Sequence, residues 1–210
     1  MGHQSIPFRD ISEGLIAGKV MNLLNRGSMR RAYLIPPIIV DFVYQAVTGV
    51  SGVRFLNASV CPVCAGLLIS HDLKQRRFST VLTPAGPQQI FVYVKRFHCR
   101  DCGRLCYADA PFYEKSRFGS PVVDLCVALS RHYTYSQAAT ILETLGIAID
   151  RGTVRKIALL HTHEVEVADL FGILLPRSVL SLSALVTGVD PEHPVTGLNV
   201  LEACGFPVST

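Results

Sequence analysis

The chain has 210 residues, of which 49% are hydrophobic and 17% are charged. This length and composition can bury a core, which excludes an intrinsically disordered chain. The formal net charge is +4, but residues 1–163 hold 19 Lys and Arg against 10 Asp and Glu, a net +9, whereas residues 164–210 hold one Arg against six acids, a net −5. A basic front part permits a polyanionic partner, although an ordinary solvated surface explains such a balance equally well.

Two features predict a cytoplasmic location. The first ten residues, MGHQSIPFRD, lack the apolar run of a signal peptide. The chain also has seven cysteines, an odd number that favours metal binding plus free buried thiols over disulfides. One apolar segment, residues 170–189, is long enough to raise the question of a membrane span. Pro176 and Arg177 interrupt it near its middle, so no membrane association is expected.

Residues 1–50 are predicted to form an N-terminal helical region. Apolar residues recur at helical spacing over residues 11–24, and a second helix is expected to open at Pro36 and Pro37 and to run to Gly49. The basic sequence NRGSMRR joins the two. Such a pair permits a homodimer or an end-binding role, with plain structural helices as the alternative.

Residues 51–112 are predicted to form a small antiparallel zinc-ribbon β domain. Segments 66–70, 76–82 and 89–98 are rich in β-branched and aromatic residues, and TPAGP between the last two is a turn signal. One Cys-x-x-Cys pair precedes this meander and a second follows it, with 34 residues between the pairs. The four cysteines are Cys61, Cys64, Cys99 and Cys102.

These two pairs predict one structural zinc ion per chain. Each Cys-x-x-Cys loop can direct two thiolates at one ion, and together the loops supply the four sulfurs that zinc accepts in a tetrahedron. Four sulfurs leave no position for an activated water, so the ion would stabilise the small domain rather than catalyse a reaction. A thioredoxin-like redox role would need a single pair at the start of a helix. His98 is predicted on a strand surface, and Cys106 in the core, rather than as ligands.

Residues 113–163 are predicted to be helical. One helix is expected over SPVVDLCVALSRH, with its apolar residues largely on one side. A second is expected to be capped by Ser136, to run through Thr144 and to stop at Gly146. Asp150 should cap a third helix that begins at Arg151. Its inward residues are expected to be Val154, Ile157, Ala158 and Leu160.

The last two of these helices match a helix-turn-helix, in which the start of the second helix enters the major groove of DNA. Arg suits guanine edges, Thr suits bases or phosphates, and Lys suits phosphates. An ordinary helical hairpin is the alternative. The candidate DNA contacts are Arg151, Thr153, Arg155 and Lys156.

The segments CPVC, KRFHCRDCGRLCYAD and FGSPVVDLCVALSRHYTYSQAATILETLGIAIDRGTVRKI together resemble the N-terminal DNA-binding part of bacterial and archaeal insertion-sequence transposases. In that family a zinc ribbon precedes a helix-turn-helix, and both hold the terminal inverted repeats of the element. The resemblance covers residues 60–161. It implies that the four cysteines bind zinc and that residues 151–156 face double-stranded DNA.

In such transposases an RNase H-like domain with an acidic triad and magnesium follows, and here 47 residues remain after His163. The sequence LSALVTGVD is compatible with a first core strand that ends in a catalytic acid, Asp190. A simple turn before Pro191 is the favoured alternative. Residues 164–210 are therefore predicted to be a truncated or incomplete C-terminal segment with no two-metal site.

The sequence thus predicts an α+β protein with N-terminal helices, a zinc ribbon, a helix-turn-helix and a short apolar C-terminal segment. The leading hypothesis is sequence-specific DNA binding by a truncated or remnant transposase that binds terminal repeats without catalysing strand transfer. An autonomous zinc-ribbon and helix-turn-helix transcription regulator is one alternative. A zinc-stapled protein-interaction module that never contacts nucleic acid is the other.

Overall fold

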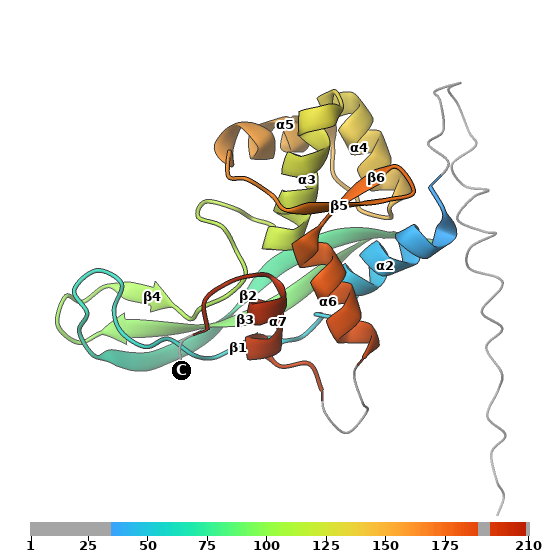
Figure 1. The fold of residues 1–210 in the computed structure, drawn as a ribbon. Coiled ribbons are helices and arrows are strands. Elements are labelled where there is room, and N and C mark those ends of the chain that lie inside the picture. The colour runs from blue at the N-terminus through green and yellow to red at the C-terminus, as the bar shows by residue number, and fades with distance from the viewer. Residues whose placement is uncertain (1–34, 189–193, 209–210) are drawn as a thin grey trace, which may run out of the picture. The chain divides into compact units, whose positions relative to one another are not determined.

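The computed structural model describes residues 35–188 and 194–208. The predicted helix over residues 11–24 and the candidate acid Asp190 lie outside the described residues. The described residues mix helices and strands and belong to one compact unit (Figure 1). The predicted α+β class is confirmed.

A long β-hairpin organises the first half of this unit. Strand β2 (Leu68–Thr83) and strand β3 (Gly86–Cys99) pair antiparallel around a turn at residues 84–85, inside the predicted turn TPAGP. Strand β1 (Arg54–Phe55) lies parallel to β3, and strand β4 (Leu105–Tyr107) lies antiparallel to it. The central strand β3 therefore connects the three others.

The hairpin has two long strands where three were predicted. The expected strands over 66–70 and 76–82 belong to one strand, because Leu73, Lys74 and Gln75 between them continue the pairing with β3. A β-bulge between Ser70 and Leu73 absorbs a change of register. Residues 71–75 are mostly exposed to water. Polar side chains therefore do not interrupt the strand, and alternation could not reveal it, because neither face is buried there.

The base of the hairpin forms the main core with helix α2 (Pro37–Thr48) and helix α3 (Ser120–His132). Helix α2 begins at the predicted prolines and has Gly49 as its C-cap, as expected. Helix α3 covers the predicted segment, but the expected single apolar side is wrong, since every residue from 120 to 129 is buried. Helices α4, α5 and α6 and strand β6 all contact α3, so no side of it faces water over this stretch.

Helices α4 (Tyr135–Thr144) and α5 (Arg151–Leu160) pack against α3 and against each other. Helix α5 begins after Asp150, which caps it as predicted by accepting a hydrogen bond from the amide of Thr153. The predicted cap of α4 is wrong by two residues. Thr134 rather than Ser136 caps it, because Thr134 and Gln137 satisfy each other's backbone amides in a capping box.

The inward face of α5 is narrower than predicted. Val154 and Ile157 are buried and Ala158 is partly buried, but Leu160 is 45% exposed. At about 100° per residue, Leu160 lies roughly a quarter-turn away from the line of Val154 and Ile157, so it points away from the core.

The C-terminal segment forms a second hairpin and two helices. Strands β5 (Val167–Leu170) and β6 (Ile173–Pro176) pair antiparallel, and helices α6 (Arg177–Thr187) and α7 (Gly197–Ala203) follow. The hypothesis of a core strand in LSALVTGVD is wrong for its described part, because residues 182–187 belong to α6. Helix α6 packs on α2, where Gly49 permits close approach: a Cβ there would lie 2.2 Å from Val186 Cγ1.

No helix among residues 35–188 and 194–208 has both the length and the apolar character that crossing a membrane requires.

Candidate metal centre and nucleic-acid interface

The first Cys-x-x-Cys loop is a tight turn held by its own backbone. The amide of Ala65 donates to the carbonyl of Cys61 at 2.8 Å, and the amide of Cys61 donates to the carbonyl of Gly66 at 3.1 Å. Ala65 has a φ of 57°, in the left-handed region. This turn folds the chain back so that Cys61 and Cys64 face the same side.

The second loop repeats these hydrogen bonds at the same spacing. The amide of Gly103 donates to the carbonyl of Cys99 at 3.1 Å, and the amide of Cys99 donates to the carbonyl of Arg104 at 2.8 Å. Gly103 has a φ of 69°, so it occupies the left-handed position that Ala65 holds in the first loop. The two loops are therefore equivalent turns, one before β2 and one after β3.

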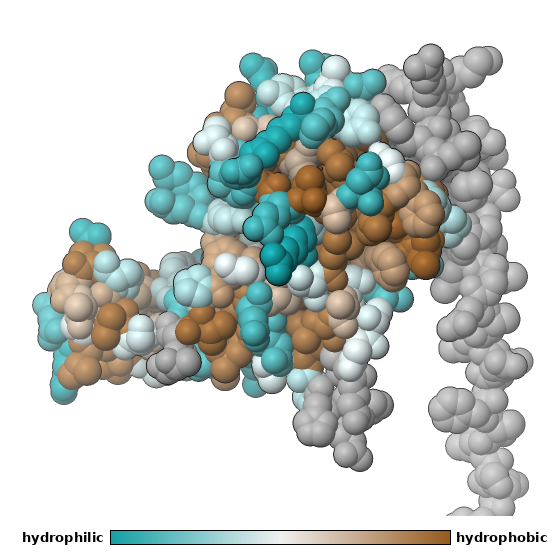
Figure 2. Space-filling view, viewed as in Figure 1, coloured by the Kyte–Doolittle hydropathy of each residue, from teal (hydrophilic) through white to brown (hydrophobic). Residues whose placement is uncertain are grey.

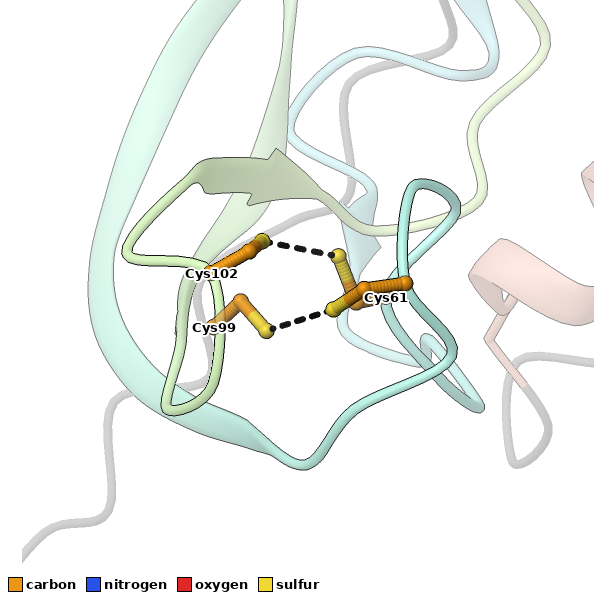
Figure 3. Close-up of side chains that lie close together, drawn as sticks. Cys61, Cys99 and Cys102 are labelled. Carbon is orange, nitrogen blue, oxygen red and sulfur yellow. Dashed lines mark hydrogen bonds between the residues drawn. The ribbon is translucent and has the colours of Figure 1, made fainter.

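The four predicted ligand residues come together at this end of the hairpin. Their sulfur atoms all lie within 4.8 Å of one another. Cys64 Sγ is 3.4 Å from Cys99 Sγ, and Cys61 Sγ is 3.7 Å from Cys102 Sγ, so each close pair joins the two loops (Figure 3). A tetrahedral ion with metal–sulfur bonds of about 2.3 Å needs sulfurs about 3.8 Å apart. The arrangement is compatible with a structural metal site.

Burial and hydrogen bonding distinguish the four thiols. Cys61 and Cys99 are buried, whereas Cys64 and Cys102 are exposed. Backbone amides of Val63 and Cys64 donate to the Cys61 sulfur and lower its pKa to about 6. The loop thus stabilises a thiolate at Cys61, and a thiolate is the form in which cysteine binds metals. A bound cation would draw the remaining thiols into the same form.

His98 and Cys106 lie next to the four cysteines in the sequence, and the structure places both. His98 is exposed on β3, as predicted, and is not part of the four-residue group. Cys106 is buried, as predicted for a core thiol, but its sulfur lies 3.7 Å from Cys61 Sγ. Sequence spacing missed this contact because β4 returns Cys106 to the site by pairing it with Phe97 on β3.

The metal-site end of the hairpin has little apolar burial of its own. Cys61, Cys99 and Cys106 form a small cluster with Leu68, separate from the main core. Apolar residues, drawn in brown, are visible at this end of the hairpin, at the left of Figure 2. The exposed apolar side chains of the two loops and of the strands next to them include Val60, Val63, Leu67, Ile69 and Leu105.

The second candidate site is the outer face of α5. Arg151, Arg155 and Lys156 are exposed, while Val154 and Ile157 hold the helix to the core. No acidic residue occupies the first turn of α5. The outer face is therefore cationic along the first half of the helix.

Thr153, a predicted DNA contact, is hydrogen-bonded to the residue that caps α5. Its hydroxyl donates to Asp150 Oδ2 at 2.6 Å, and its amide donates to Asp150 Oδ1 at 3.0 Å. These bonds lower the pKa of Asp150. The Thr153 hydroxyl is thus committed to the helix cap, which leaves its methyl group and its acceptor lone pairs for a ligand.

The connection between α4 and α5 is attached to the sheet. Gly146 has a φ of 81° and supplies the predicted stop for α4. Its carbonyl accepts from the amide of Leu82 at 2.8 Å, and the amide of Ala148 donates to the carbonyl of Thr80 at 2.8 Å. Residues 145–150 form this connection, which is longer than the three or four residues of a typical helix-turn-helix.

A shallow hollow lies on the outer face of α5, lined by Gly152, Arg155, Lys156, Leu159 and Leu160. Leu159 is 63% exposed. Apolar side chains thus continue the cationic face toward the end of the helix, a feature that motif matching did not predict.

No family model, no curated protein and no solved structure matches this chain significantly.

Proposed function

We propose that this protein binds double-stranded DNA through α5, with α4 and α5 acting as a helix-turn-helix and α5 as its recognition helix. The observation that carries the proposal is the cationic outer face of α5. Arg151, Arg155 and Lys156 are exposed on a helix whose opposite face is anchored by Val154 and Ile157. This combination gives a rigid helix with long cationic side chains available for base edges and phosphates.

Local electrostatics supports a polyanionic ligand at this face. The N-terminus of a helix carries a partial positive charge, and the backbone amides there attract anions. Asp150 at the helix start accepts from the amide and hydroxyl of Thr153 and keeps its negative charge, but the exposed cations of α5 outnumber it. Phosphates approaching Arg151 or Arg155 would therefore meet a mainly positive surface.

We further propose that the four-cysteine site binds one zinc ion per chain as a structural ion. Zinc is the cation best suited to four thiolates in a tetrahedron, and the sulfur separations agree with that geometry. The residues that would hold it are Cys61, Cys64, Cys99 and Cys102. The ion would fasten the two loops together and so stiffen the end of the hairpin.

The transposase resemblance suggests which DNA is bound. Under that hypothesis the target is the terminal inverted repeat of a mobile element, and this chain contributes binding rather than strand transfer. A transcription regulator would instead bind an operator. Selection of preferred duplexes from a random pool identifies the DNA sequence that is bound. The positions of that sequence separate the two hypotheses, because a terminal repeat occurs twice, in inverted orientation, at the ends of one element.

Fluorescence anisotropy with a selected duplex and its shuffled version, across a salt series, tests the proposal. Arg151→Ala and Arg155→Ala should leave the fold intact and each weaken binding by about 1 to 3 kcal/mol, with reduced sequence preference if the side chain contacts a base. Lys156→Ala should weaken binding to both duplexes equally and reduce the salt slope by about one unit.

Arg177→Ala is the matched control, since it removes the same charge from an exposed position outside α5, where Arg177 pairs with Glu166 at 2.9 Å. It should bind like the wild type. Circular dichroism checks each variant. Wild-type protein that binds neither duplex at low salt, or α5 variants that bind as tightly as the Arg177 control, would refute the recognition helix.

A protein-interaction module is the second candidate, favoured by the exposed apolar end of the same face. Leu159 and Leu160 line the hollow together with Arg155 and Lys156. A protein partner with an apolar ridge and acidic flanks would suit this surface. Such a partner would be sensitive to Leu159→Ser, whereas DNA binding through Arg151 and Arg155 would change little.

A further inference from the structure

A fifth thiol, that of Cys106, lies beside the four-cysteine site. Cys61 Sγ lies 3.7 Å from Cys102 Sγ and also 3.7 Å from Cys106 Sγ. Both distances match the sulfur separation of about 3.8 Å that a tetrahedral thiolate site requires. Cys106 is outside the group of four whose sulfurs are all mutually close. Five thiols therefore lie around a position where a four-coordinate ion would bind only four.

The two competing thiols are held very differently. Cys106 is 5% exposed and lies on β4, whose pairing places it opposite Phe97 on β3. Cys102 is exposed and lies in the turn between β3 and β4. Besides its contact with Cys61, the Cys106 thiol donates to the carbonyl of Arg104 at a long 3.9 Å. The strand thus presents a buried sulfur with only weak hydrogen bonds to lose.

Cys64, the other exposed cysteine of the four, has no such spare thiol beside it among the described residues. Cys64 Sγ lies 3.4 Å from Cys99 Sγ, whereas the Cys106 thiol contacts Cys61. The two loops are equivalent in their backbone hydrogen bonds, so Cys64 and Cys102 occupy corresponding positions. The partner of Cys102 across the site, Cys61, has the spare thiol of Cys106 beside it. The partner of Cys64 is Cys99.

We propose that Cys106 is a reserve ligand, which takes the position of Cys102 when that exposed cysteine leaves the ion. The inference rests on the proposed metal site and applies to thiophilic divalent cations such as zinc and cobalt. In the exchange, the metal–sulfur bond to Cys102 breaks, a bond to the Cys106 thiolate forms, and the Cys106 proton passes to the released Cys102 thiolate. The ion keeps four sulfurs throughout, so the hairpin retains its metal.

Cobalt substitution of the full chain tests the exchange, because the absorption of cobalt(II) reports tetrahedral coordination and the number of thiolates. Cys102→Ala should retain the spectrum of four thiolates. Cys64→Ala is the matched control and should show the weaker spectrum of three. Cys102→Ala/Cys106→Ala should also show three, and its zinc dissociation constant, measured by competition with a chelator, should exceed that of Cys102→Ala by at least about tenfold.

Cys102→Ser, which nearly preserves side-chain size, is measured beside the alanine variant to allow for a misfolded loop, and it should retain the same four-thiolate spectrum. If both Cys102 variants give the spectrum and affinity of Cys64→Ala, the reserve role of Cys106 is refuted while the metal site stands. If the wild-type protein binds neither cobalt nor zinc, the metal site itself fails and the exchange fails with it.

Discussion

Asp124 is a buried carboxyl group that joins segments far apart in the sequence. It lies on α3, is 5% exposed, and accepts hydrogen bonds from Tyr113 Oη at 2.9 Å, His163 Nε2 at 3.0 Å and Ser178 Oγ at 2.6 Å. Burial and the nearby Asp124 charge raise the pKa of Tyr113, so the phenol remains a donor. One residue thus ties α3 to the segment after α5 and to the start of α6.

Replacing Asp124 with Ala should lower the free energy of unfolding by about 3 kcal/mol. The change leaves one buried donor, Ser178, and two partly buried donors without their acceptor. Hydrogen bonds to a charged group are worth about 1.5 to 3 kcal/mol each, partly offset by relaxation and water entry. Urea denaturation followed by circular dichroism measures the loss. Asp41→Ala removes an exposed acid from α2 and should change stability by less than about 0.5 kcal/mol. Equal effects of the two substitutions would show that the Asp124 network contributes nothing.

At the scale of elements, the position of α5 depends on the sheet. The connection before α5 forms a bridge to β2, with hydrogen bonds between Leu82 and Gly146 and between Thr80 and Ala148. Leu145 and Ile147 in this connection are fully buried. The candidate recognition helix is therefore held at its start by the base of the hairpin as well as by α3.

Gly146→Ala should destabilise the protein by about 1 to 2 kcal/mol, because an L-residue with a φ of 81° brings its Cβ close to its own backbone. The nearest atom to an added Cβ is Tyr44 Cδ2 at 3.8 Å, so the cost is conformational rather than steric contact with a neighbour. Thermal denaturation measures it.

Gly146→Asn is the informative comparison, since asparagine tolerates the left-handed conformation better than other L-residues. It should recover part of the stability lost in Gly146→Ala. Loss of DNA binding in Gly146→Ala under conditions where the protein stays folded would link the connection to the placement of α5. An alanine variant as stable as the wild type would contradict the conformational argument.

At the scale of the whole molecule, two apolar clusters of unequal size divide the described residues. The larger contains the base of the hairpin and the helices, and the smaller contains Cys61, Cys99 and Cys106 at the metal-site end. The smaller cluster buries too little apolar surface to offset the entropy of ordering its loops. Under the proposed function, the bound ion and the continuing strands would therefore carry the stability of that end.

Removing the metal should loosen the end of the hairpin and leave the helical part folded. A chelator such as EDTA is expected to increase amide hydrogen exchange at residues 61–70 and 97–107, with protection of α3 unchanged, because α3 is buried in the larger cluster. Mass-spectrometric hydrogen exchange on zinc-loaded and chelated protein measures both regions.

Cys64→Ala supplies the comparison for chelation, since it removes one proposed ligand without adding a reagent. It should reproduce the effect of the chelator at the hairpin end. Unfolding of α3 along with the hairpin, or no change at either place, would contradict the division into two clusters.

Local sequence signals were sufficient for the boundaries of several helices and for the four cysteines that come together. The prolines before α2, Asp150 before α5 and Gly146 after α4 act through the backbone within a few residues, so their effect is readable without the fold. A Cys-x-x-Cys loop is likewise a local turn, and both loops adopt the same one. The mutual approach of the two loops depends on β2 and β3 forming one two-stranded hairpin, which the three predicted strands did not imply.

The remaining features depend on contacts between distant segments. Strand β2 continues through polar residues because β3 pairs with it, and α6 is a helix because its apolar side has α2 to pack against. Cys106 reaches the four-cysteine group through the pairing of β4 with β3. Asp124 accepts hydrogen bonds from three other segments. Helix caps and turns are determined by residues that are close in the chain. Burial, strand pairing and the contacts of Cys106 and Asp124 are determined only when the tertiary structure brings distant residues together.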